Sequence, residues 1–165
     1  MANVKPVPEG FHTATPYLAV RGASAAIEFY KRAFSAQEIS RMTGPDGKVA
    51  HAEIRIGDSP VMLADEAPEW GNQSPAALGG TPVNIFLYVP DVDTVYQRAL
   101  DAGAQSRMAP ADMFWGDRFS KITDPFGHEW GIATHIEDVA PEEMKKREQA
   151  FREQMAQGQQ KQAQG

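Results

Sequence analysis

The 165-residue sequence contains no cysteine, so it has no disulfide framework, no thiol nucleophile and no thiolate metal ligand. It also lacks any apolar run close to the ~18–20 residues that a membrane-spanning helix needs. Its first 16 residues do not contain the apolar segment of a secretion signal. We therefore expect a cytoplasmic protein with no membrane partner.

Positive charge is also scarce. The formal net charge is −6, and the lysines and arginines do not gather into a stripe along the chain. A phosphate backbone would be repelled at long range, which argues against nucleic acid as a partner. Hydrophobic residues make up 42% and charged residues 23%, as is typical of a soluble globular protein.

The chain contains an internal repeat. Tyr-Lys-Arg-Ala-Phe at 30–34 recurs as Tyr-Gln-Arg-Ala-Leu at 96–100, an offset of 66 residues. Arg-Ile-Gly-Asp at 55–58 recurs as Lys-Ile-Thr-Asp at 121–124 with the same offset. Two separated segments that share one offset indicate a duplicated structural module.

Each copy begins with one strand, continues with helical spacing and ends in three short strands. The first copy has a strand over 15–20, a helix over 23–34, and strands near 36–43, 49–57 and 60–65. The second has a strand over 82–89, a helix over 92–102 capped by Asp91, and strands near 104–109, 116–123 and 128–134. The sequence therefore predicts an α+β fold made of two tandem βαβββ modules.

The remaining segments complete the expected domain organisation. We expect an N-terminal arm at 1–10, a first module at 11–65, a linker at 66–81 and a second module at 82–137. Residues 138–165 are expected to form a charged helix that ends near 157. A Gln-rich tail with the composition of a disordered segment follows.

Alternation along the strands separates two faces in each module. In the first module Ala52, Ile54 and Ile56 should pack under the helix, which turns His51, Glu53 and Arg55 to the other face. In the second module the same reasoning places Asn84, Phe86 and Tyr88 on the face away from the helix. Because these faces carry charged and aromatic side chains, we expect them to line a cavity. The alternative is a solvated outer surface.

Three motifs carry a family resemblance. They are Phe-Trp-Gly-Asp-Arg at 114–118, Asp-Pro-Phe-Gly-His-Glu-Trp at 124–130 and Thr-His-Ile-Glu-Asp at 134–138. With the two βαβββ copies, they resemble the vicinal oxygen chelate superfamily, which includes glyoxalase I, the bleomycin- and fosfomycin-resistance proteins and the extradiol dioxygenases. The resemblance implies a cupped sheet around one cavity, with the helices outside. It also makes a homodimer plausible, because members pair their two modules within a chain or swap them between chains.

Metal-dependent members of the superfamily take one ligand from the first strand and one from the last strand of each module. The resemblance places Thr15, Met62, Asn84 and Gly131 at these four positions. A divalent cation prefers carboxylates or imidazoles, and these residues offer neither. We therefore expect no metal cofactor.

His51 and Glu53 are the candidate catalytic residues. They lie on one face of one strand, about 7 Å apart along the chain, so His51 could act as a general base oriented by Glu53. The alternative is a structural ion pair between Glu53 and Arg55 with a solvated His51. Applying the 66-residue offset pairs His51 with Asp117, and a displaced metal site formed by these two residues and Glu53 is conceivable.

Further residues are candidates for ligand binding. Trp115, Asp117 and Arg118 follow a loop of the kind that often lies at the mouth of a cavity, and an indole beside a guanidinium can hold a flat or anionic molecule. The alternative is that Trp115 fills the core while Arg118 pairs with Asp117 or Asp124. The full candidate set is Tyr17, Arg55, Met62, Asn84, Phe86, Tyr88, Trp115, Asp117, Arg118 and Phe119.

Three functions are consistent with these observations. The first is binding of a small planar or aromatic molecule in a metal-free pocket. The second is an enzyme of the lyase, isomerase or dioxygenase type that uses a metal or the His51 and Glu53 pair. The third is recruitment of another protein by the C-terminal helix.

Overall fold

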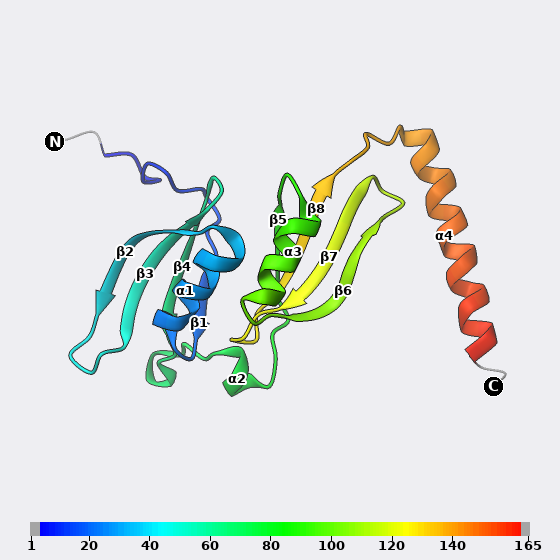
Figure 1. Cartoon of the computed structure of the whole chain (residues 1–165). Helices are drawn as coiled ribbons and strands as arrows, with labels where there is room; N and C mark the ends of the chain where they lie inside the picture. The colour runs from blue at the N-terminus through cyan, green and yellow to red at the C-terminus, as the bar shows by residue number, and fades with distance from the viewer. Residues whose placement is uncertain (1–3, 163–165) are drawn as a thin grey trace.

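The computed structural model describes residues 4–162, and it confirms the α+β fold of two βαβββ modules (Figure 1). The first module comprises β1 (Tyr17–Val20), α1 (Ala23–Phe34), β2 (Gln37–Thr43), β3 (Val49–Ile56) and β4 (Ser59–Asp65). The second comprises β5 (Asn84–Tyr88), α3 (Val92–Asp101), β6 (Gln105–Asp112), β7 (Asp117–Thr123) and β8 (Glu129–His135). Residues 1–3 of the expected N-terminal arm lie outside the described residues.

Each module forms its own four-stranded sheet. The strand orders are β1-β4-β3-β2 and β5-β8-β7-β6, with a parallel pair at β1-β4 and at β5-β8 and antiparallel pairs elsewhere. The predicted alternation is confirmed in β3, where Ala52, Ile54 and Ile56 are buried beneath α1. We call the face of each sheet that points away from its helix the open face.

The two modules meet through their helices and through one buried polar cluster. Helices α1 and α3 pack against each other. The Tyr30 hydroxyl and the Trp130 indole N–H both donate to Oδ2 of Asp124, at 2.8 and 2.9 Å. Oδ1 of Asp124 accepts the backbone N–H groups of Phe126 and His128, which closes the Asp-Pro-Phe-Gly turn. Burial and the neighbouring Asp124 raise the pKa of Tyr30 well above its ordinary value, so Tyr30 is a hydrogen-bond donor here.

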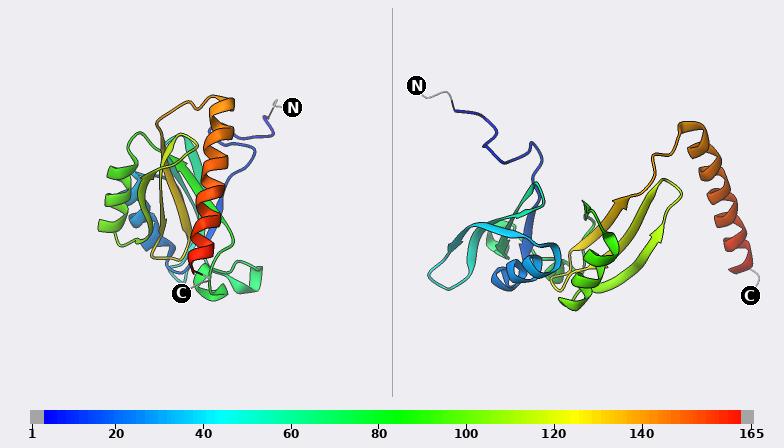
Figure 2. Two further views of the ribbon diagram at one scale, coloured as in Figure 1. Left: turned by 90° about the vertical axis from the view of Figure 1, so that its right-hand side faces the viewer. Right: turned by 45° about the horizontal axis from the view of Figure 1, so that its top comes forward.

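The two sheets of one chain do not form the single cup that the resemblance implies. Within residues 4–162, no strand of the first sheet contacts a strand of the second. Helices α1 and α3 lie together on the same side of the two sheets, and the sheets extend away from each other on either side of the helix pair (Figures 1 and 2). The helices therefore lie outside the open faces, as expected, but the two open faces do not enclose a shared cavity within one chain.

The strand register corrects two expectations. One row across the first sheet joins Tyr17, Met62 and Glu53, and the matching row across the second joins Phe86, Gly131 and Lys121. Thr15 therefore precedes β1, and Tyr17 occupies the position opposite Met62. The offset between matching residues is 69 for β1 and β5, 68 for β3 and β7 and 69 for β4 and β8, whereas the helices repeat at 66, so residues are inserted on both sides of the helix. His51 is consequently level with Phe119, and its pairing with Asp117 was wrong.

The linker and the C-terminus form the remaining helices. The linker contains a 3₁₀ turn (Pro68–Trp70) and the short α2 (Pro75–Leu78). Helix α4 (Pro141–Gln162) lies apart from every other described helix and strand (Figures 1 and 2). It ends at Gln162 rather than near 157, and residues 163–165 of the expected tail lie outside the described residues. Among the described residues, no helix is both long and apolar enough to cross a membrane.

Candidate functional site

The open face of the second sheet carries four aromatic side chains. Phe86 and Phe119 stack with their ring centroids 5.5 Å apart and an interplanar angle of 5°. Tyr88 packs against Phe86 at 5.1 Å, and Trp115 lies 6.3 Å from Phe119. Phe86 and Tyr88 remain 47% and 66% exposed, so this floor is available to another molecule. We call these four residues the aromatic floor.

A buried carboxylate anchors one end of the aromatic floor. Asp117 is 4% exposed, and its Oδ2 accepts the Tyr88 hydroxyl at 3.1 Å and the Trp115 indole N–H at 3.0 Å. Its Oδ1 lies 2.8 Å from Nδ1 of His135. The hydrogen bond to Asp117 and desolvation raise the pKa of Tyr88, so this phenol remains a donor at neutral pH. Asp117 therefore fixes an indole, a phenol and an imidazole from three different segments.

The Trp-Gly-Asp motif folds this way because of Gly116. Its φ is +99°, which favours glycine, and an added Cβ would lie 2.2 Å from the carbonyl oxygen of Glu137. The Gly116 carbonyl accepts the backbone N–H groups of Ile136 and Glu137. This close approach holds Trp115 and Asp117 beside the end of β8.

Gly131 allows the aromatic floor to lie flat on the sheet. An added Cβ at Gly131 would lie 2.9 Å from Cε2 of Phe119 and 2.9 Å from Cδ2 of Phe86. Both rings therefore lie so close to the backbone of β8 that no residue with a Cβ atom would fit at position 131 without displacing them. A glycine in the middle of a strand weakens the strand, and here it makes room for two stacked rings.

The open face of the first sheet is polar. Nδ1 of His51 lies 3.3 Å from the Tyr17 hydroxyl, and Nε2 lies 3.4 Å from Oε1 of Glu53. The two candidate catalytic residues are therefore brought together, with Tyr17 as a third member. Both separations are at the long end for hydrogen bonds, and all three side chains are partly solvated. Met62 and Arg55 share this face, and Arg55 forms no ion pair with Glu53 in the described chain.

Two candidate ligand-binding residues of the second sheet lie apart from the aromatic floor. Arg118 points to the helix side of the second sheet, where it pairs with Asp93 of α3 and with Asp112 of β6 at 2.6 and 2.8 Å. Its parity along β7 is opposite to that of Asp117 and Phe119, so the expected indole–guanidinium pair does not form. Asn84 is on the open face at the beginning of β5, level with Glu129.

The four positions that the resemblance assigns to metal ligands carry no carboxylate and no imidazole. Thr15 lies before β1 and donates its hydroxyl to the His12 carbonyl at 3.2 Å. Met62 offers a thioether, and Gly131 is covered by the rings of Phe86 and Phe119. Within residues 4–162, no three His, Cys, Asp or Glu side chains gather in a way that could hold a metal ion.

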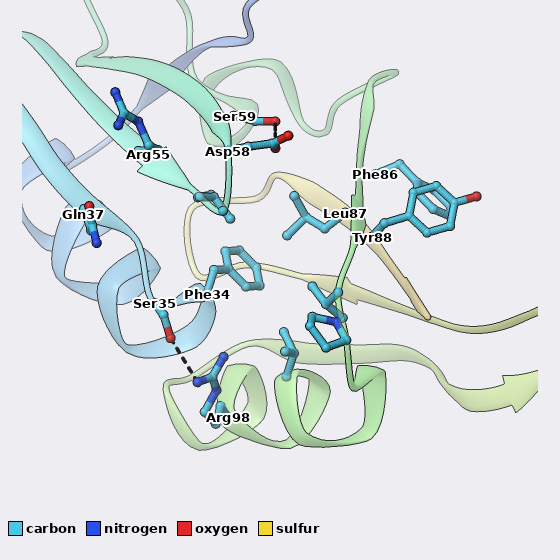
Figure 3. A pocket seen from close by; sticks show the side chains of 15 residues that line it. Phe34, Ser35, Gln37, Arg55, Asp58, Ser59, Phe86, Leu87, Tyr88 and Arg98 are labelled. Atoms are coloured by element: carbon cyan, nitrogen blue, oxygen red, sulfur yellow. Dashed lines mark hydrogen bonds between the residues drawn. The ribbon is translucent and has the colours of Figure 1, made fainter. Parts of the chain in front are cut away.

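A separate cavity of about 550 Å³ lies between the modules, on the helix side of β5 (Figure 3). Phe34 and Leu87 point into it, whereas Phe86 and Tyr88 extend away on the other side of β5 (Figure 3). Arg98 closes its lower end by donating to Ser35 at 3.0 Å (Figure 3). This cavity is formed by both modules, and Phe86 and Tyr88 of the aromatic floor and Arg55 of the first open face contribute to its lining.

Sequence reasoning missed one member of the site. His135 joins Asp117 through Nδ1 and the exposed Asp138 through Nε2, at 2.8 and 2.9 Å. The hydrogen bonds to Asp138 and then to Asp117 raise the pKa of His135 above its ordinary value. The signal was present in the Thr-His-Ile-Glu-Asp motif, because parity places His135 on the same face as Gly131.

Known proteins resemble this chain over most of its length. An uncharacterized protein of Mycobacterium tuberculosis is 47% identical over 133 residues, covering 79% of this chain and 78% of that protein. Protein YjdN of Escherichia coli is 29% identical over 144 residues, covering 72% of this chain and 92% of that protein. These relatives extend through both modules.

Solved structures of similar fold and a family model also match most of this chain. The structure of the Arabidopsis thaliana gene product At5g48480 has a TM-score of 0.61 and 28% identity, covering 74% of this chain and 98% of that one. TioX from Micromonospora has the same fold, with a TM-score of 0.59 and 24% identity, covering 78% of this chain and 100% of that one. The family model matches residues 11–132. The chain therefore belongs to the Glyoxalase/Bleomycin resistance protein/Dioxygenase superfamily.

Proposed function

We propose that this protein binds a small planar or aromatic molecule on the aromatic floor, without a metal ion. The observation that carries the proposal is the aromatic floor itself. Because residue 131 is a glycine, Phe86 and Phe119 can lie flat against β8. Partly exposed rings held in a fixed orientation offer a stacking surface to a flat ligand at little cost in side-chain entropy.

The proposal extends to a homodimer in which a second copy completes the pocket. Each sheet leaves its open face uncovered in one chain, and no strand contact joins the two sheets within residues 4–162. A partner chain would bring its polar face, with Tyr17, His51 and Glu53, over the aromatic floor of the first. Light scattering during size-exclusion chromatography should give twice the chain mass of 18.1 kDa. A strictly monomeric protein would remove this part of the proposal.

The binding proposal can be tested with 2-naphthamide, which is flat and uncharged. Isothermal titration should show saturable binding, and Phe86→Ala should weaken it about tenfold through the loss of stacking and apolar contact. Trp70→Ala is the matched control, because Trp70 is also an exposed aromatic residue but lies in the linker. Equal affinities for the wild type and Phe86→Ala would contradict the proposal.

The second candidate function is acid–base catalysis by the first sheet. It is favoured by the chain of contacts from Tyr17 through His51 to Glu53. An imidazole held between a phenol and a carboxylate can move a proton to or from a bound molecule. If this sheet is catalytic, Glu53→Gln should lower kcat for a turned-over substrate and leave the dissociation constant unchanged. A variant with unaltered kcat would exclude Glu53 from the chemistry.

A further inference from the structure

His135 is held at the end of the aromatic floor by two carboxylates of very different burial. The Asp117 side chain is 5% exposed, and the Asp138 side chain is completely exposed. Asp117 also binds Tyr88 and Trp115, so its position is fixed by three partners. The hydrogen bonds to Asp138 and Asp117 raise the pKa of His135, which shifts the imidazole towards its cationic form.

The two contacts of the imidazole therefore play different roles. The bond from Nδ1 to Asp117 sets the orientation of the ring, and it directs Nε2 away from the buried carboxylate. Nε2 meets only Asp138, which makes no other side-chain hydrogen bond in the described chain. An ion pair with a fully exposed partner contributes little to stability, so another anion can replace Asp138 at small cost.

The distance between His135 and the aromatic rings limits how far the acidic group of a bound ligand can lie from the ligand's ring. Ala133 lies opposite both Tyr88 and Phe119, and His135 lies opposite Asp117. The two positions on β8 are two residues apart on the same face, which corresponds to ~7 Å. A molecule that stacks on the rings at Ala133 would thus reach Nε2 with an acidic group attached directly to a bicyclic ring or through a short linker.

The other cations on this face are already paired. Lys121 and Arg107 lie towards the opposite end of the second sheet, and both contact Glu129, at 3.0 and 3.6 Å. Glu129 is only 19% exposed, so replacing it with a ligand would leave a partly buried carboxylate without a partner. His135 is therefore the cation whose partner is most easily exchanged.

We propose that the ligand of the aromatic floor is a planar aromatic acid, whose anionic group takes the place of Asp138 on Nε2 of His135. The proposal rests on the proposed function, because it requires that the floor bind a planar molecule. It adds a chemical class, and it assigns Asp138 the role of an internal substitute for the anion of the ligand.

The test compares 2-naphthoate with 2-naphthamide, which have nearly the same shape but differ in charge, by isothermal titration at pH 6. The wild type should bind the acid about tenfold more tightly than the amide. Asp138→Asn should raise this ratio about threefold, because it removes the competing carboxylate. His135→Gln should reduce the ratio to about one. Asp101→Asn removes the same charge from the exposed surface of α3 and should leave the ratio unchanged.

The outcomes separate the two proposals. Equal affinities for acid and amide, unaffected by either variant, would overturn the acidic ligand and leave planar binding intact. A lower ratio in Asp138→Asn would also overturn it, because Asp138 would then position the imidazole rather than occupy the place of the ligand. If neither compound binds, both this inference and the proposed function are contradicted.

Discussion

The two open faces derive from one duplicated module, yet they differ in how firmly their side chains are held. In the first sheet, Tyr17, His51 and Glu53 are joined by two contacts of 3.3 and 3.4 Å. In the second, Asp117 accepts three contacts of 2.8 to 3.1 Å. The first face is polar and loosely connected, and the second combines stacked rings with a buried acid.

This difference indicates that the open face of the second sheet is the more preorganised for ligand binding. A fixed aromatic surface loses little side-chain entropy on binding, whereas long side chains that are partly solvated must be ordered first. The second sheet is therefore suited to hold a molecule, and the first is suited to adjust to one. Substitutions on the second face should therefore have larger effects than substitutions on the first.

Asp117→Ala should have the largest effect. The change leaves the Trp115 indole N–H, the Tyr88 hydroxyl and His135 without their shared acceptor, and we expect a loss of about 2–3 kcal/mol in the free energy of unfolding. Glu53→Ala on the first sheet should cost about 0.5 kcal/mol or less, because its contact is long and partly solvated. Urea denaturation measures both. Similar losses for the two variants would show that the faces are equally organised.

Gly131→Ala should have the next largest effect. The new Cβ would displace both rings of the stacked pair, and we expect a loss of about 1–2 kcal/mol together with weaker binding of 2-naphthamide. Phe119→Leu should recover part of this loss in the double variant, since it frees space above Gly131. On the first sheet, Met62→Leu should cost less than about 1 kcal/mol. An additive double variant would mean that the rings do not press on β8.

The pH dependence of stability should report on His135. His135 has a raised pKa in the folded protein, so its contribution is fully present below the ordinary imidazole pKa and is lost as the pH rises through the raised value. Between pH 5 and pH 8.5, the Tm of His135→Gln should therefore fall less steeply with rising pH than the Tm of the wild type. His51→Gln serves as the matched change on the first sheet. A wild-type profile retained in His135→Gln would contradict this assignment.

Tyr17→Phe should have the smallest effect. It removes a hydroxyl whose contact with His51 is 3.3 Å long and exposed to solvent. The free energy of unfolding should change by no more than about 0.5 kcal/mol. A loss well above 1 kcal/mol would indicate that the first face is as firmly connected as the second.

Local sequence patterns were sufficient to predict the modules. The helix over 23–34 and the alternation in β3 follow from short-range spacing, and the structure has both. The internal repeat was detected from the helices and from the segments 55–58 and 121–124, but its offset of 66 residues does not describe the strand register. Pairing His51 with Asp117 assumed one offset throughout, but the offset changes from 66 in the helices to 68 between β3 and β7.

The site was harder to predict because it depends on contacts between distant segments. Phe86, Tyr88, Phe119 and Trp115 were identified by parity and by motif, and the structure brings all four together. The role of Asp117 as a shared acceptor was not apparent, because its three donors come from positions 88, 115 and 135. The arrangement of the two sheets also depends on the packing of α1 against α3, which strand patterns do not specify.

The central claim is that the aromatic floor binds a planar molecule without a metal. The most direct test titrates 2-naphthamide into protein treated with EDTA, and into the same protein supplied with one equivalent of Ni²⁺, Zn²⁺, Mn²⁺ or Fe²⁺. We predict the same affinity in every case, because Thr15, Met62, Asn84 and Gly131 offer neither a carboxylate nor an imidazole to a cation. Binding that requires stoichiometric metal, and disappears with EDTA, would contradict the account.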